Sequence, residues 1–221
     1  GIPTKIVFNS SRSNGADGIL SVQNINSISD LKGKTIALEK GTPSHFLLLK
    51  ALDSVGLSGS DVELSSMSPG DAGVAFASGK VEAAVTWEPW LTEAKEKGNG
   101  KILVDSTDFP IIVDVWIASD NALKNKKPAL QKYVDSWFET IDYLKVNPKE
   151  SNEIMGKNYG MSGDDFAGFL QTVKLMERPE AVESMKSLPA LVEDAERLWK
   201  QEKIIESVLP GNEIVSQEFL K

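Results

Sequence analysis

The chain has 221 residues, 41% of them hydrophobic, a length and composition typical of a globular protein that can bury its own core. The absence of cysteine excludes disulfides, thiolate metal sites and cysteine nucleophiles, and a formal net charge of −8 disfavours nucleic acid or anionic membranes as partners. No run of about 18 apolar residues is present, so the sequence predicts no membrane-spanning helix.

Short β-rich runs alternate with helical segments over the first two thirds of the chain, a pattern that predicts an α/β fold with a largely parallel sheet. From residue 128 onward the apolar spacing becomes helical. The chain opens directly on a strand-like run, so any targeting segment is expected to lie outside this sequence. The expected strands are 5–9, 34–39, 61–67, 81–87, 101–105 and 111–118, and the expected helices start near Pro43, Pro69, Pro128, Pro148, Ser162 and Pro189.

The residues that follow the expected strand 34–39 are typical of an anion site at a helix start. A glycine there allows a tight turn, Thr42 suits the N-cap and Pro43 suits the first helical position. The amides of Ser44 and His45 would lack intrahelical acceptors at the positive end of the helix dipole. Together with the Thr42 and Ser44 hydroxyls, they would bind a carboxylate, sulfonate or phosphate. The alternative is an ordinary helix cap that faces water.

His45 is the only histidine in the chain. A catalytic or metal-binding role would need a nucleophile or further ligands, and one histidine without any cysteine supports neither. We therefore expect no catalytic residue, no metal site and no cofactor. His45 is interpreted as a residue of the first helical turn that hydrogen-bonds locally.

Three acidic residues lie in unusual surroundings. Glu88 follows an expected strand, Asp114 interrupts an apolar run, and Asp17 shares a glycine-rich segment with Asn14. A lone buried carboxylate is costly, so each needs a cationic or hydrogen-bonding partner. Each acid also has a structural alternative, which is a helix N-cap for Glu88, an edge strand facing solvent for Asp114 and a turn for Asp17. Together they suit a zwitterionic or amine-bearing ligand.

The run VTWEPWL places Trp87 and Trp90 around Glu88 and Pro89. Tryptophan faces provide a flat apolar wall and attract cations. Pro89 is expected at the first position of a helix. Thr86, Trp87 and Glu88 therefore either cap that helix under a core or line a ligand site.

Longer stretches of the sequence resemble a known family. The runs SISDLKGKTIALEKGTPSHFLLLKALDSVGLSGSDVEL and PGDAGVAFASGKVEAAVTWEPWL are similar to nitrate-, sulfonate- and taurine-type substrate-binding proteins of ABC importers. The likeness extends in order from about residue 10 to residue 200 and includes the helix start GTPSH and the turn WEP. It implies a type II periplasmic-binding-protein architecture, with two α/β lobes, two crossings and a ligand held in the cleft.

Mapped onto this chain, the resemblance implies a complete α/β lobe at residues 19–110 and a first lobe made of residues 1–18 and 111–221, with a helical C-terminal part. Family members carry roughly ninety further residues ahead of this segment, so the first lobe is expected to be incomplete and to expose a sheet edge. A homodimer or a separate N-terminal fragment would complete it. The residues expected to bind the ligand are Asn14, Asp17, Thr42, Pro43, Ser44, His45, Thr86, Trp87, Glu88 and Asp114.

The resemblance implies a non-enzymatic receptor that binds a small anion or zwitterion, such as a taurine-like aminosulfonate, and delivers it to a membrane permease. Such a protein would be periplasmic, or extracellular and lipid-anchored. The alternatives are a receptor for a pyrimidine-type thiamine precursor and the effector-sensing domain of a regulator. Thiamine-pyrimidine synthases share the fold, but the resemblance to them implies a cysteine-rich, histidine-dependent chemistry, which this chain cannot supply.

Overall fold

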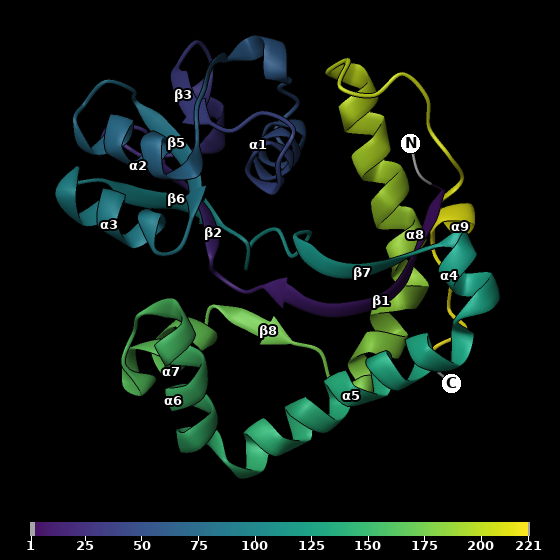
Figure 1. The fold of residues 1–221 in the computed structure, drawn as a ribbon. Helices are drawn as coiled ribbons and strands as arrows, with labels where there is room; N and C mark the ends of the chain where they lie inside the picture. The colour runs from purple at the N-terminus through teal and green to yellow at the C-terminus, as the bar shows by residue number, and fades with distance from the viewer. Residues whose placement is uncertain (1–2, 221) are drawn as a thin grey trace. The chain divides into compact units, whose positions relative to one another are not determined.

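Contacts within the computed structural model, which describes residues 3–220, divide the chain into two compact units. The first unit comprises the residues up to Arg12, Val113–Arg197 and the residues from Ser207 onward, and the second comprises Ser13–Ile112 and Leu198–Glu206. The second unit is thus inserted into the first, and a short later segment returns to it. Figure 1 draws the body of this second unit in purple to teal.

The boundaries of these units differ from those expected for the lobes. The chain passes from one unit to the other after residues 12 and 112 rather than after 18 and 110, and residues 198–206 belong to the second unit instead of the first. The physical reason is packing, because Leu198 is buried and the ring of Trp199 lies 5.9 Å from that of Phe46 in the second unit. The correspondence of the two units to binding-protein lobes stays a prediction.

A five-stranded sheet with the order β4-β3-β5-β2-β6 forms the centre of the second unit (Figure 1). Strand β3 (Thr35–Leu38) runs parallel to β4 (Glu63–Ser66) and β5 (Ala83–Trp87), whereas β2 (Asp17–Ser21) is antiparallel to β5 and to β6 (Lys101–Asp105). The α/β class is confirmed, but the sheet is mixed rather than largely parallel. Strand β2 was missed because its five residues reveal their pairing only through partners distant in sequence.

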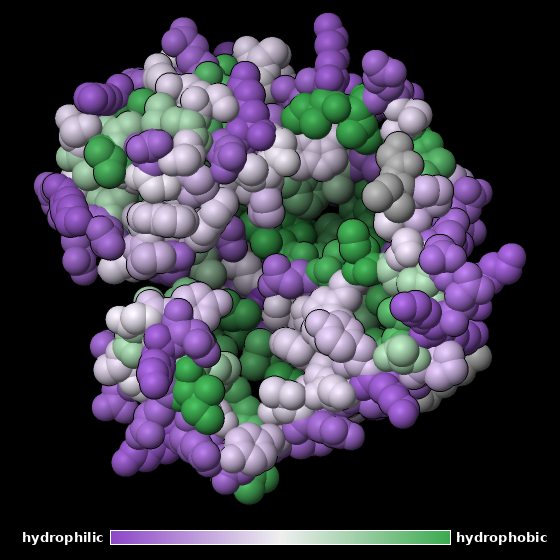
Figure 2. All heavy atoms as spheres, in the orientation of Figure 1, coloured by the Kyte–Doolittle hydropathy of each residue, from purple (hydrophilic) through white to green (hydrophobic). Residues whose placement is uncertain are grey.

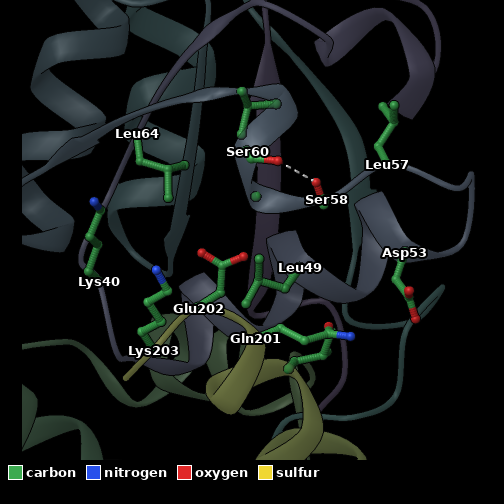
Figure 3. A pocket seen from close by; sticks show the side chains of 13 residues that line it. Lys40, Leu49, Asp53, Leu57, Ser58, Ser60, Leu64, Gln201, Glu202 and Lys203 are labelled. Atoms are coloured by element: carbon green, nitrogen blue, oxygen red, sulfur yellow. Dashed lines mark hydrogen bonds between the residues drawn. The ribbon is translucent and has the colours of Figure 1, made fainter. Parts of the chain in front are cut away.

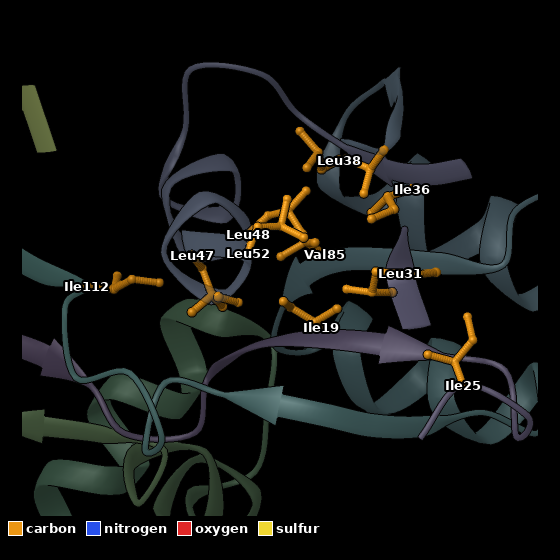
Figure 4. Packing of buried hydrophobic residues seen from close by; sticks show 13 residues of the cluster. Ile19, Ile25, Leu31, Ile36, Leu38, Leu47, Leu48, Leu52, Val85 and Ile112 are labelled. Atoms are coloured by element: carbon orange, nitrogen blue, oxygen red, sulfur yellow. The ribbon is translucent and has the colours of Figure 1, made fainter. Parts of the chain in front are cut away.

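Helices and short 3₁₀ turns flank this sheet, namely η1 (Ile28–Leu31), α1 (Pro43–Asp53), η2 (Gly59–Asp61), α2 (Pro69–Ala77) and α3 (Trp90–Lys97). Alternate side chains of each strand point to opposite faces, so each face of the sheet contributes to a separate hydrophobic core. Leu38 and Val85 pack with α1, and Figure 4 shows Leu48 of that helix beside Val85. Ala37 and Ala84 pack on the other face with α2 and α3. Because helices pack on both faces of the sheet, the ends of its strands are held in place.

The first unit contains a three-stranded sheet with the order β7-β1-β8 and most of the helical C-terminal part. Its elements are β1 (Thr4–Ser13), β7 (Val113–Ser119), α4 (Asp120–Asn125), α5 (Lys127–Val146), α6 (Pro148–Tyr159), α7 (Gly163–Leu170), β8 (Val173–Leu175), α8 (Arg178–Gln201) and α9 (Gly211–Ile214). Strands β1 and β7 are antiparallel, and Phe8 lies opposite Trp116 with the two ring centroids 5.1 Å apart. Among the described strands, β7 pairs only with β1, which leaves its other edge open.

Helix α8 corrects the expectation of a helix start at Pro189, because it runs through this proline without interruption. A proline in a helix interior lacks the N–H that would bond to the carbonyl four residues earlier. That carbonyl belongs to Met185, and the side-chain amide of Gln217 donates to it over 3.2 Å. A tertiary hydrogen bond therefore satisfies the group that the proline leaves free.

The surface over α6 and α7 carries scattered apolar groups among hydrophilic ones, as Figure 2 shows. Ile154 and Tyr159 of α6 are among the exposed large side chains. In the part of the chain that the structure describes, no helix combines the length and the apolar character needed to cross a membrane.

Candidate functional site

One edge of the second unit's sheet collects most of the residues expected to bind a ligand. The parallel strands β3 and β5 end at this edge, and β2, which is antiparallel to β5, begins there with Asp17 opposite Trp87. Helix α1 starts shortly after β3 ends, so its first turn lies at the same edge. Open α/β sheets bind ligands outside the carboxyl ends of their strands, which makes this edge the candidate site.

The start of α1 follows the predicted sequence of turn, cap and proline. Gly41 has a φ of 78°, Thr42 is the extended N-cap residue, and Pro43 occupies the first turn. The Thr42 hydroxyl, however, donates to the carbonyl of Glu39 over 2.7 Å and makes no cap hydrogen bond. Since its proton is already used, this hydroxyl has no donor to offer an anion.

Two buried polar atoms lie in the first turn of α1. Ser44 and His45 are each 1% exposed, and neither Ser44 Oγ nor His45 Nε2 has a hydrogen-bond partner among the described residues. The helical hydrogen bonds begin only at the amide of Phe46, which donates to Thr42 over 3.1 Å. Residues 42–45 therefore form what we call the anion seat, an uncapped helix start with unsatisfied polar side chains.

His45 is held in one tautomer by its own turn. The amide of Gly41 donates to His45 Nδ1 over 3.3 Å, so the neutral ring carries its proton on Nε2. Burial, with a smaller contribution from the charge of Lys40, lowers the pKa of His45 from 6.5 to about 4. The imidazole is thus neutral at pH 7 and presents an unpaired N–H donor. The expected local hydrogen bond is present, and the other ring nitrogen, Nε2, has no partner among the described residues.

Trp199 is a neighbour of the anion seat that sequence reasoning missed. Its ring lies 5.3 Å from the ring of His45 and 5.9 Å from that of Phe46, measured between centroids. Trp199 lies near the end of α8, in the segment 198–206 that belongs to the second unit. It shields His45 from water, which is the condition for the lowered pKa. No local pattern in the sequence connects these distant positions.

Thr86 and Trp87 end strand β5 at the same edge. The Thr86 hydroxyl is fully buried and donates to the carbonyl of Pro69 over 2.9 Å, so it joins β5 to the start of α2. Trp87 is half-buried, and its ring packs edge-on against Trp90 with centroids 5.9 Å apart. Of these two expected site residues, Trp87 keeps surface for a ligand, whereas the Thr86 hydroxyl is already used.

Glu88 bonds to the first turn of the helix that follows it. Its carboxylate accepts hydrogen bonds from the amide of Thr92 over 3.2 Å and from the Thr92 hydroxyl over 2.7 Å. Helix α3 begins at Trp90 rather than at Pro89, which is the N-cap residue and follows a cis peptide bond. Glu88 is therefore not the N-cap residue itself, but its carboxylate bonds to the first turn of α3 from the position just before the cap.

Asn14 lies in the bend that enters the second unit, and Asp17 is the first residue of β2 directly after it. Asn14 is exposed and Asp17 is buried. A network of serine hydroxyls holds the turn, because the Ser13 and Ser106 hydroxyls lie 2.7 Å apart and the amide of Asp17 donates to Ser13 over 3.2 Å. Asp17 is therefore a strand residue rather than the turn residue of the alternative, and it lies at the sheet edge where α1 starts.

Asp114 belongs to the first unit, whereas the other candidates belong to the second. It is an exposed residue of β7, and its carboxylate accepts a hydrogen bond of 2.5 Å from the hydroxyl of Ser11, its partner across the β1–β7 pair. The edge-strand alternative describes this residue. Its expected place in the ligand site stays a prediction.

Residues 11–151 match the model of a protein family described as NMT1/THI5 like. The chain is 29% identical over 157 residues to a putative aliphatic sulfonates-binding protein of Escherichia coli K12, an alignment that covers 70% of this chain and 49% of that protein. It is 24% identical over 151 residues to the taurine-binding periplasmic protein of the same strain, with 66% and 47% covered. The chain therefore spans about half the length of these relatives.

Solved structures show the same fold. The periplasmic aliphatic sulphonate binding protein SsuA of Escherichia coli superposes with a TM-score of 0.79 at 24% identity, over 97% of this chain and 69% of that one. The desulfurization enzyme DSZB superposes with a TM-score of 0.64 at 17% identity, over 98% and 78%. At these identities the likeness establishes the fold alone. The family match and the sequence relatives confirm the resemblance found in the sequence.

Proposed function

The chain belongs to the NMT1/THI5-like family, and we propose from this premise that it is the solute-binding component of an ABC importer for a small anionic or zwitterionic compound. The observation that carries the proposal is the pair of buried, unpartnered polar groups in the anion seat, Ser44 Oγ and His45 Nε2. An unpaired buried polar group costs about 1–3 kcal/mol. A bound solute would remove that cost.

The chemistry of the anion seat favours an oxyanion. The Ser44 hydroxyl and the His45 Nε2–H are neutral donors beside the N-terminus of α1, where the helix dipole attracts negative charge. A sulfonate or carboxylate offers several oxygens that can accept hydrogen bonds from these donors without requiring the site to be protonated. Because the His45 pKa is about 4, this donor set stays uncharged at neutral pH and selects acceptors through hydrogen bonds.

A taurine-like aminosulfonate fits the remainder of the sheet edge. Asp17 lies opposite Trp87 across β2 and β5, which puts a carboxylate and an aromatic face where a ligand ammonium could bind. A simple anion such as nitrate would instead meet the negative charges of Asp17 and Glu88, and like-charge contact costs several kcal/mol in a desolvated site. The sulfonate- and taurine-binding relatives support the same solute class. A pyrimidine stacked on Trp87 is the competing outcome.

Calorimetric titration with taurine, ethanesulfonate, nitrate and an aminopyrimidine tests the proposal. Taurine should bind most tightly, and Ser44→Ala should weaken it about fivefold, because a neutral hydrogen bond contributes about 1 kcal/mol. Lys97→Gln is the matched control, since Lys97 pairs with Glu93 on α3 at 2.7 Å, remote in sequence from the anion seat. Tight nitrate binding without any response to taurine would refute the solute class, and an unchanged Ser44→Ala affinity would refute the anion seat.

The cellular role follows from the same proposal. The protein would work in the periplasm, or lipid-anchored outside the cell, and pass its solute to a membrane permease. We assign it no catalytic step, because the relatives described above are binding proteins, while the likeness to DSZB extends only to the fold. An effector-sensing role on the same fold would appear as solute binding without stimulation of the permease's ATPase activity, which reconstitution in liposomes measures.

A further inference from the structure

A cavity of about 610 Å³ lies within the second unit, and Figure 3 shows the side chains that line it. Its walls come from Lys40 ahead of α1, the later turns of α1, the turn η2, the neighbourhood of β4 and the segment 198–203 at the end of α8. All of these parts belong to the second unit. The volume falls in the range of about 300–1,000 Å³ that small-molecule sites occupy in proteins.

The cavity has an apolar wall. Leu49, Leu57, Val62, Leu64 and Leu198 line it. The side chains of Leu57 and Leu64 are only half-buried, so apolar surface remains exposed to the cavity. Removing such surface from water is favourable in proportion to the area buried, so this wall favours a ligand with an apolar body.

Charged groups without ion-pair partners complete the lining. Lys40, Glu202 and Lys203 line the cavity, and the structure shows no hydrogen bond or ion pair for their side chains within the part of the chain it describes. Figure 3 shows the Glu202 carboxylate projecting into the cavity between the two lysines and Leu49. Other acids and lysines of this unit do pair, as Lys34 and Glu82 do at 3.1 Å.

The Glu202 carboxylate also lies against the backbone of η2. A Cβ added at Gly59 would be only 2.5 Å from Glu202 Oε1, so the absence of a side chain at Gly59 makes room for this group. The carboxylate is therefore in close van der Waals contact with the turn, half-buried, and available to accept hydrogen bonds from a ligand.

We propose that this cavity is a second ligand site, which binds a small zwitterion with an apolar body, such as an apolar amino acid. Lys40 and Lys203 would bind the ligand's carboxylate, Glu202 its ammonium, and the leucine wall its side chain. The proposal is independent of the solute bound at the anion seat. It differs in chemistry as well, because the anion seat offers neutral donors whereas this cavity offers charges of both signs.

Three probes with the same phenyl body separate the contributions: L-phenylalanine carries both charges, 3-phenylpropionate only the carboxylate, and 2-phenylethylamine only the ammonium. Changes in amide NMR chemical shifts locate the binding site. Phenylalanine should shift the amide resonances of Gly59 and Ser60 and should bind more tightly than the other two probes. Lys203→Gln should weaken phenylalanine and phenylpropionate about three- to fivefold, the size expected for solvent-exposed ion pairs, and leave phenylethylamine unchanged. Glu202→Gln should weaken phenylalanine and phenylethylamine instead.

Lys97→Gln is again the control, because it removes the same charge from a helix that does not line the cavity. Lys203 and Glu202 are preferred to Lys40 as test positions, since the charge of Lys40 also acts on His45. Thermal unfolding verifies that each variant is folded. Three results would overturn the proposal. The first is a set of phenylalanine-induced shifts confined to Ser44 and His45, and the second is the absence of shifts at 10 mM probe, roughly the weak limit for a specific site. The third is equal affinity of the Lys203→Gln and Lys97→Gln variants for phenylalanine. Taurine binding in the same samples reports on the anion seat separately.

Discussion

His45 should make the second unit sensitive to acid well above the pH at which its carboxylates titrate. The pKa of His45 falls from 6.5 to about 4 in the folded protein, chiefly because the ring is buried. Between these two values the unfolded chain binds more protons than the folded one, so the free energy of unfolding decreases as the pH is lowered. Above pH 6.5 the histidine contributes no pH dependence.

The structure sets the size of this effect. Each unit of difference between the folded and unfolded pKa values is worth about 1.4 kcal/mol, so the loss of unfolding free energy has an upper limit of about 3.5 kcal/mol. The carboxylates with lowered pKa values in this unit, Asp30, Asp61 and Glu82, lose their stabilising effect at the acidic end of that range and below it. Their contribution must therefore be subtracted.

The variant His45→Gln performs that subtraction. Glutamine keeps a polar side chain at this position but does not titrate, so its pH profile contains the carboxylate background alone. Urea unfolding at pH values from 4 to 7.5, combined with hydrogen exchange of the α1 amides, measures the stability of both proteins in this unit. The two curves should diverge below pH 6.5. Parallel curves would refute the reasoning, because they would mean that His45 is solvated enough to keep an ordinary pKa.

Two further predictions concern the first unit. Gln217→Ala should lower the free energy of unfolding, measured by urea unfolding, by about 1–2 kcal/mol, because it leaves the Met185 carbonyl unpaired opposite Pro189. In a Pro189→Ala background the same substitution should cost less, since the alanine N–H can then bond to that carbonyl. An equal cost in both backgrounds would contradict this explanation. The open edge of β7, where Ile117 is 64% exposed, should support association through strand pairing; light scattering should show oligomers that Ile117→Lys reduces, and a stable monomer at high concentration would rule this out.

Part of the candidate site could be predicted from the sequence because it depends on local rules. A glycine turn, Thr42 before Pro43 and an apolar stripe after them predict a helix start wherever that helix packs. The structure places the helix where this pattern indicates, from Pro43 to Asp53. The uncapped amides follow from the same geometry, since the first turn of any helix lacks internal acceptors.

Other features were decided by partners that no local pattern identifies. The hydroxyls of Thr42 and Thr86 both donate to carbonyls of the chain, and the Glu88 carboxylate accepts hydrogen bonds from Thr92 of the following helix. Three residues that looked available for a ligand are therefore already bonded within the chain. Trp199 reaches His45 from a distant part of the chain. Side-chain hydrogen bonds are short-ranged and directional, so residue type alone does not say which partner wins.

The sequence by itself determined the α/β class, the positions of most strands and the helix start at Pro43, since periodicity and capping act over a few residues. Only the tertiary structure decided that β2 runs antiparallel, that α8 continues through Pro189, and that Ser44 and His45 are buried without partners. Burial and strand pairing depend on contacts between residues far apart in the chain, and such contacts determine which polar groups remain free to bind a ligand.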